Sequence, residues 1–223
     1  MLKRLSKLAE KIREHWKNKY LAQGVSYIIW LFVEILGRLS DDWRIIIDVM
    51  GQRALFFKGR GNYVKAGDLF GVCLDISRTL GDQGLEQVYL GELAEVYIKT
   101  ERSSFALPLA NHAVRLAREY AKADLCRRLT ERGQILAILC RLEMAADDYR
   151  EALTPEVENQ AHPSHQVGGR LAYAKLLYYE EPHHRTFEDA AFALVEQAEV
   201  IARENHLERR LEQIAALKIE WKI

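Results

Sequence analysis

Histidine is the residue type in this sequence that most directly suggests chemistry, because imidazole binds metal ions and transfers protons near neutral pH. His162 and His165 form one pair, and His183 and His184 form another. We expect a helix over 165–180 to separate the pairs, and at about 1.5 Å per residue that helix would hold them ~24 Å apart. Ligands of one ion lie within ~2 Å of it. The spacing therefore predicts solvated loops, with no metal site and no cofactor.

Two further patterns could support catalysis. Asp41–Asp42 follows Ser40, which predicts a helix N-cap, and Asp147–Asp148 is expected to lie on a polar helix face. The stretch "KGRGN" at 58–62 has neither the preceding strand nor the spacing of a phosphate-binding loop. No catalytic base accompanies either pattern, so we predict that the protein is not an enzyme.

Composition indicates a helix-rich globular protein. The chain has 223 residues, 49% of them hydrophobic and 29% charged, with a net charge of zero. This balance provides no general attraction to nucleic acid, and no nucleic-acid partner is expected. Three widely spaced cysteines and the lack of a secretory pattern favour a reducing cytoplasm. We expect Cys73, Cys126 and Cys140 all to be small buried side chains.

An internal repeat organises most of the chain. Residues 50–81 align with residues 90–121 without a gap at an offset of 40. A third copy starts near Leu129, with Gly133 at the small site of its first helix, and a looser fourth copy includes Tyr173. The repeated small and large positions of the second helices are Ala66, Phe70 and Cys73, then Ala106, Ala110 and Ala113, then Ala145, Tyr149 and Ala152, then Ala191, Val195 and Ala198.

This alternation has a physical cause. Small residues at helical spacing let two helix axes approach, and large neighbours fill the remaining volume. A helix pair with two apolar flanks must stack on the next pair to bury both. We therefore expect ten or eleven helices and no strand, with helices at 2–20, 24–39, 42–58, 62–80, 84–100, 104–121, 123–140, 142–153, 165–180, 187–205 and 207–221.

"LGELAEVY" at 90–97 and "GNYVKAGDLFGVC" at 61–73 resemble tetratricopeptide repeats, of the long type with about 40 residues per copy. The best three copies cover roughly 43–153. The resemblance implies an all-α fold, a right-handed α-solenoid of antiparallel helix pairs. Two departures are Arg53 and Arg132, which stand where the family usually has leucine.

The last helix should cap the array. In 207–221 we expect Leu211, Ile214, Ala215 and Leu217 to point inward, and Glu208, Arg209, Arg210, Glu212 and Lys218 to point outward.

The N-terminal segment, 1–40, is predicted to be a separate helix pair in front of a repeat domain over 41–223. Residues 1–20 hold seven Lys/Arg and two Glu, a net charge of +5. Residues 25–36 are apolar around the whole circumference of a helix. Packing on the array, contact with an anionic membrane surface and a homodimer contact all remain open for this pair. The contact residues would be Leu5, Leu8, Ile12, Trp16 and Trp30.

The resemblance implies a concave face, lined by the first helix of each pair, that binds a partner's peptide or helix. The corresponding residues here are Gln52, Leu55, Lys58, Glu92, Glu95, Lys99, Arg127, Glu131, Gln134 and Tyr173. Gly51, Leu55 and Glu92 stand at three sites where the chaperone-binding subfamily has its carboxylate clamp, so that clamp is expected to be absent.

The predicted function is a cytoplasmic protein-interaction adaptor or regulatory scaffold. One alternative is a membrane-peripheral assembly factor tethered through 1–39, and another is a ligand-sensing bacterial regulator. Co-sedimentation with vesicles would distinguish the membrane-peripheral factor from the adaptor. A large increase in melting temperature with a small ligand would distinguish the ligand-sensing regulator.

Overall fold

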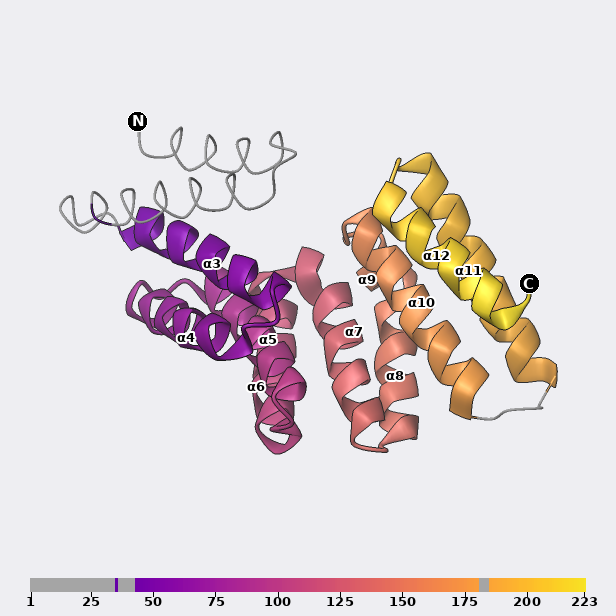
Figure 1. Cartoon of the computed structure of the whole chain (residues 1–223), viewed down its shortest axis with the longest axis horizontal. Helices are drawn as coiled ribbons and strands as arrows, with labels where there is room; N and C mark the ends of the chain where they lie inside the picture. The colour runs from indigo at the N-terminus through magenta and orange to yellow at the C-terminus, as the bar shows by residue number, and fades with distance from the viewer. Residues whose placement is uncertain (1–34, 36–42, 181–184) are drawn as a thin grey trace. The chain divides into compact units, whose positions relative to one another are not determined.

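The computed structural model describes Ile35, residues 43–180 and residues 185–223 (Figure 1). Within these residues all regular structure is α-helical. The helices are α3 (Trp43–Gly59), α4 (Tyr63–Thr79), α5 (Gln83–Lys99), α6 (Ser103–Tyr120), α7 (Lys122–Ile138), α8 (Leu142–Ala152), α9 (Pro155–Glu158), α10 (Pro163–Glu180), α11 (Arg185–Glu204) and α12 (Glu208–Trp221).

The repeat pattern located the helices well. Every helix expected from residue 42 onward is present, and no end is shifted by more than two residues. The sequence analysis missed α9, which lies between the helices expected at 142–153 and 165–180; Pro155 occupies its first turn and Val157 is buried. Pro is favoured at the first helical position because its missing N–H has no partner there anyway. The helices expected at 2–20 and 24–39, and Asp41–Asp42, lie outside the described residues.

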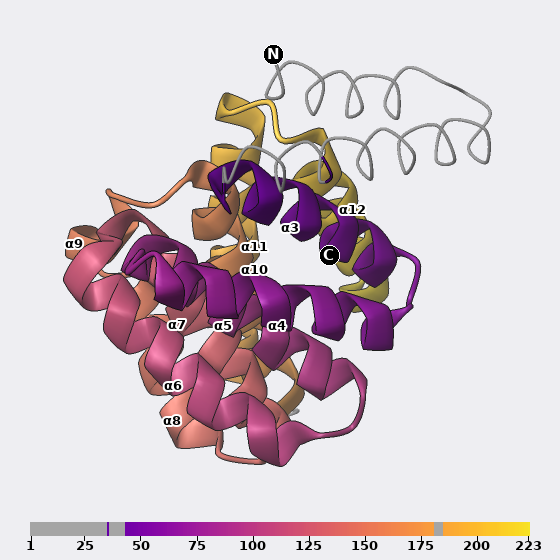
Figure 2. The same ribbon diagram turned by 90° about the vertical axis from the view of Figure 1, so that its left-hand side faces the viewer.

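The chain divides into two compact units, residues 1–100 and residues 101–223. In unit 1, α4 packs against both α3 and α5, and Figure 2 shows α3 beside α4. In unit 2, α7 packs against α6, α8 and α10, while α11 packs on α10 and α12 packs mostly on α11. The boundary at residue 40 stays a prediction.

The core of unit 1 follows the small–large–small pattern. Ala66, Phe70 and Cys73 are all buried, and the Phe70 ring lies 6.3 Å from that of Tyr89. Gly51 on α3 allows Tyr89 of α5 to come close, since a Cβ at Gly51 would lie 2.9 Å from the Tyr89 hydroxyl oxygen. That hydroxyl donates to the Ile47 carbonyl at 3.4 Å. The space left by the glycine on one helix is therefore filled by a ring from another helix.

Unit 2 repeats this arrangement between α7 and α8. A Cβ at Gly133 would lie 2.6 Å from a ring carbon of Tyr149, which is itself buried between Ala145 and Ala152. Tyr173 of α10 then packs on the Tyr149 ring at 5.9 Å between centroids. In α11, the second helix of the fourth repeat copy, the predicted small–large–small pattern is also confirmed, because Ala191, Val195 and Ala198 are all buried.

An aromatic cluster helps to hold the capping helix α12. Trp221 stacks on Tyr178 of α10 with ring centroids 4.1 Å apart, and its Nε1 donates to the Tyr179 hydroxyl at 3.1 Å. Ile214 and Leu217 are buried as expected, but Ala215 is exposed. The inward prediction for Ala215 was wrong because Trp221 rather than Ala215 completes the buried stripe.

Two of the outward predictions for α12 need correction as well. Arg210 is half-buried, with Nε donating to the Ser164 hydroxyl at 3.2 Å. Lys218 is half-buried and pairs with Glu199 of α11. Both side chains therefore help to dock α12 instead of facing only solvent.

The three cysteines do not share one environment. Cys73 and Cys126 are buried, as predicted, whereas Cys140 is exposed. Cys140 ends the turn after α7 with a φ of 56°, a left-handed conformation that closes the helix. The prediction of burial was wrong for Cys140 because its apolar neighbours belong to a helix that stops just before it.

Two glycines should respond oppositely to alanine. Gly133→Ala should destabilise the protein by about 1–3 kcal/mol, because the new methyl must displace the Tyr149 ring. Gly71→Ala should stabilise it by about 0.5–1 kcal/mol, since a Cβ at this helical site meets no atom within 4 Å. Urea unfolding monitored by circular dichroism measures both. Equal effects of the two substitutions would contradict the packing role of Gly133.

Candidate functional site

The predicted partner-binding residues of unit 1 include a three-residue ion-pair cluster. Lys58 of α3 donates to Glu92 at 2.5 Å and to Glu95 at 2.8 Å, both on α5. Only 6% of the Glu92 side chain is exposed, against 18% for Lys58. The structure thus brings three of the predicted residues together and joins two first helices through them.

The protonation of Lys58 follows from this geometry. Burial by itself lowers the pKa of Lys58, but the charges and hydrogen bonds of Glu92 and Glu95 together raise it above its ordinary value. The ammonium group therefore stays charged throughout the physiological range. Much of the charge predicted for partner binding is neutralised inside the unit.

The other predicted residues of unit 1 remain more accessible. Leu55 is 41% exposed and Lys99 is exposed, while Gln52 is half-buried. Gly51, at one of the expected clamp positions, lies buried under Tyr89. The face available to a ligand in unit 1 therefore combines an apolar side chain with separate polar ones.

In unit 2, the predicted residues lie on α7 and α10. Arg127 donates to Glu131 at 2.8 Å, and Gln134 is exposed on the same helix. Tyr173 is half-buried against the core cluster of Leu136 and Tyr149. Its ring therefore has a packing role in addition to any contact that it makes with a ligand.

Sequence reasoning missed Arg128. This side chain is only 1% exposed and donates to Glu131 at 2.5 Å. Arg128 stands three residues after Leu125 and seven before Ile135, so helical spacing places it at the edge of the buried stripe of α7. Arg127, by contrast, falls on the opposite side. That spacing is the signal that could have identified Arg128.

The first histidine pair lies at the start of α10. The prediction of a solvated loop was wrong for His165, which is half-buried in the first turn of that helix, while His162 just before it is exposed. His162 and His165 have ring centroids 5.8 Å apart, and the His162 Nδ1 accepts from the Ser164 backbone N–H at 3.2 Å. No group of three metal-binding side chains occurs among the described residues. His183 and His184 lie outside them.

His165 has an unusual protonation behaviour. Burial, followed by the positive charge of Arg127, lowers the pKa of His165 to about 4. Its place in the first turn of α10 acts in the same direction, because the N-terminal end of a helix disfavours a cation. At neutral pH the imidazole is therefore uncharged.

The predicted membrane or dimer contacts, Leu5, Leu8, Ile12, Trp16 and Trp30, all lie outside the described residues. Among the helices that are described, none combines the length and the apolar character that crossing a membrane requires.

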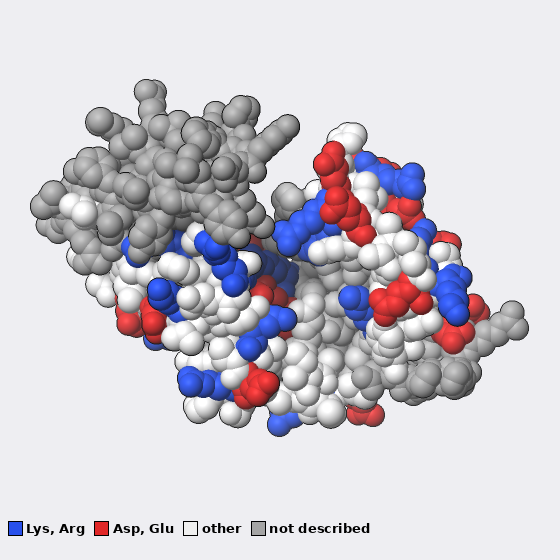
Figure 3. All heavy atoms as spheres, viewed as in Figure 1, with Lys and Arg blue, Asp and Glu red and all other residues white. Residues whose placement is uncertain are grey.

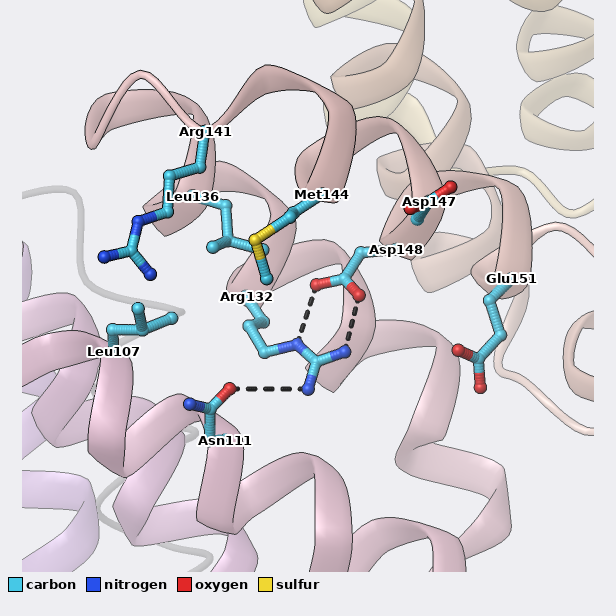
Figure 4. A pocket seen from close by; sticks show the side chains of 9 residues that line it. All are labelled: Leu107, Asn111, Arg132, Leu136, Arg141, Met144, Asp147, Asp148 and Glu151. Atoms are coloured by element: carbon cyan, nitrogen blue, oxygen red, sulfur yellow. Dashed lines mark hydrogen bonds and ion pairs between the residues drawn. The ribbon is translucent and has the colours of Figure 1, made fainter.

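A cleft opens in unit 2 between α6 and α8, with α7 as its floor (Figure 4). Arg132 of α7 donates to the two carboxylate oxygens of Asp148 at 2.7 and 2.5 Å, and to Asn111 of α6 at 3.4 Å. The prediction that Asp148 lies on a polar face was wrong, because this carboxylate is buried by its pair with Arg132. The pair also accounts for an arginine at a position where tetratricopeptide repeats usually have leucine.

Surface charge is mixed in sign. Figure 3 shows basic and acidic side chains interspersed over the face in view. This pattern fits the absence of net charge in the sequence. The described residues on this face form no extended basic surface of the kind that phosphate backbones require.

The fold is shared with solved tetratricopeptide-like repeat structures. BtubC (BKLC) from P. vanneervenii is 14% identical, with a TM-score of 0.59 over 92% of this chain and 91% of that one. A putative kinesin light chain from Podosopora anserina with nearly identical TPR-like repeats is 14% identical, with a TM-score of 0.63 over 92% and 96%. A variant of that kinesin light chain is 13% identical, with a TM-score of 0.66 over 92% of this chain and 96% of that one. At these identities the likeness concerns the fold.

No family model matches the chain. No curated protein matches it either.

Loss of Lys58 should be costly. Lys58→Met should lower the free energy of unfolding by about 2 kcal/mol, because the buried Glu92 loses a cationic partner. Lys99→Met, on the exposed part of the same predicted face, should change it by less than about 0.5 kcal/mol. Urea titrations at pH 7 compare the two. A Lys58 variant as stable as the Lys99 variant would show that the cluster contributes nothing to unit 1.

His165 should make the protein sensitive to acid. Its pKa is about 4 in the fold against 6.5 unfolded, so the unfolded chain binds more protons between these values and stability falls as pH falls. Between pH 7.5 and pH 5, the free energy of unfolding of wild type should therefore fall by about 1.5 kcal/mol more than that of His165→Gln. Gln160→Asn, an exposed substitution that removes no titratable group, is the control and should track wild type. A constant difference between His165→Gln and wild type would contradict the effect.

Proposed function

We propose that the protein is an interaction adaptor or regulatory scaffold that binds a partner's peptide or helix on the first-helix face of a unit, which is the surface of α3 and α5 in unit 1 and, separately, the surface of α7 and α10 in unit 2. The tetratricopeptide-like fold carries this proposal, because folds of this kind generally mediate protein–protein interactions. Stacked helix pairs present such a face without needing to rearrange, which lowers the entropic cost of binding.

The chemistry of this face argues for a partner of mixed charge. In unit 1, Lys58 is satisfied by Glu92 and Glu95, so its ammonium group is already engaged. In unit 2, Arg127 and Arg128 both donate to Glu131. A ligand that relied on a single strong charge would have to displace these contacts. A ligand anchored by apolar contact with Leu55, with polar contacts around it, would not have to break these ion pairs.

The lack of a carboxylate clamp supports the same conclusion. Gly51 contributes no side chain, and Glu92, at another clamp position, offers no cation and is already paired with Lys58. An acidic C-terminal tail is therefore disfavoured as the ligand. An internal segment of the partner, extended or helical, fits better.

Two alternatives from the sequence stay predictions. One is a membrane-peripheral or dimeric assembly factor that uses residues 1–39, and the other is a ligand-sensing regulator. We prefer the adaptor role because it uses residues whose contacts the structure describes. A cytoplasmic location would suit it.

Peptide display on the full chain, followed by calorimetry, tests the proposal. A peptide that binds unit 1 should lose about tenfold in affinity with Leu55→Asp, and a peptide that binds unit 2 should lose about tenfold with Gln134→Glu, since each substitution changes an exposed residue of that unit's first-helix face. Val72→Asp is a matched control, because Val72 of α4 is also 41% exposed but belongs to a second helix. The affinity of the peptide for Val72→Asp should equal its affinity for wild type. Peptides that respond only to Val72→Asp would refute binding on the first-helix face.

A further inference from the structure

The α6–α8 cleft, the pocket drawn in Figure 4, lies away from the first-helix face because its walls are second helices. Its volume is about 320 Å³, near the lower end for ligand pockets in general. Such a volume accommodates one or two side chains rather than a large cofactor. Leu107, Leu136 and Met144 form its apolar part, and Met144 is 52% exposed.

Each acidic group of this cleft already has an arginine partner. Asp148 accepts two hydrogen bonds from Arg132. Glu151 accepts two from Arg118 at 2.7 Å, and Asp147 pairs with Arg150. A cationic ligand would therefore compete with an arginine for every carboxylate in the lining, which makes such a ligand unfavourable.

Arg141 differs from the other arginines around the cleft. It lies in the turn between α7 and α8, is exposed, and forms no ion pair with any residue in the described part of the chain. Figure 4 shows its guanidinium group at the Leu107 end, beside the apolar part of the cleft. The cleft therefore presents one uncompensated positive charge next to an apolar surface.

Asn111 adds a directed hydrogen-bond donor. Its Oδ1 accepts from Arg132 at 3.4 Å, which orients the amide so that Nδ2 is turned away from Arg132 (Figure 4). An NH₂ group in this position can donate to a backbone carbonyl of a bound segment. The flexible Met144 side chain can adapt to the shape of an apolar anchor.

From these observations we propose that the α6–α8 cleft is a second docking site, which binds a segment of a partner protein that presents a leucine-sized apolar side chain next to an acidic residue. The apolar side chain occupies the space between Leu107 and Met144, and the acidic residue pairs with Arg141. Complementary charge selects the segment, because Arg141 is the group of the described lining that lacks an opposite charge. The site is independent of binding on the first-helix face.

Methionine methyl NMR of the full chain tests this proposal directly. The sequence has three methionines; Met144 reports on the cleft, and Met50, buried in α3 of unit 1, is the internal reference. The probe is the acetylated and amidated peptide Gly-Leu-Glu-Gly. It should shift the Met144 resonance saturably, with a Kd of about 1 mM as suits a single-side-chain anchor, and should leave Met50 unchanged.

Charge reversal provides the matched comparison. The peptide Gly-Leu-Lys-Gly should bind about threefold more weakly, as expected for one exposed ion pair. Arg141→Glu should reverse that order. Arg115→Glu introduces the same charge on α6 at an exposed arginine outside the lining and should leave the order unchanged. Thermal melts of each variant confirm that it is folded before the titrations are compared.

Three results would overturn the proposal. The first is a Met144 resonance that neither peptide shifts, or that both shift equally with wild type and with Arg141→Glu. The second is N-acetylleucine binding as tightly as the peptide, which would make the occupant a small carboxylate. The third is a Met144 shift that depends on protein concentration without peptide, which would make it a second copy. None of these bears on peptides selected for the first-helix face.

Discussion

The close approach of helices at a glycine, which has no side chain, is the constraint on which the rest of this structure depends. At Gly133 the Tyr149 ring occupies the space that a Cβ would need, and at Gly51 the Tyr89 hydroxyl does so. The ring fills the volume that the glycine leaves, so the interior stays closely packed. Each contact sets the distance between two helices, and that distance decides which of their polar side chains can reach one another.

The ion pairs follow from those distances. Lys58 reaches Glu92 because α3 and α5 are held together where Tyr89 contacts Gly51. Arg132 reaches Asp148 because α7 and α8 are held together nearby. In both places a long basic side chain spans the gap between helices and neutralises a buried carboxylate, which would be unfavourable alone. The same packing leaves Arg141, in the turn beyond it, without such a partner among the described residues.

This separation between packing and surface explains why the fold is a weaker guide to ligands than to architecture. Tetratricopeptide-like folds share their small and large positions, but their ligands depend on surface side chains that packing does not constrain. Here much of the charge on the first-helix face of unit 1 is used within the unit. The uncompensated charge of the α6–α8 cleft lies instead among second helices.

The sequence by itself determined the helices and their buried stripes, because a repeat of small and large residues has one packing solution at helical spacing. Nine helices of the described part of the chain, and the buried pattern through Ala198, were predictable for this reason. Only the tertiary structure decided which polar residues pair across helices, as with Asp148, and that Trp221 rather than Ala215 docks the last helix. Such contacts depend on side-chain reach between segments far apart in the chain, and the periodicity of one helix holds no information about that distance.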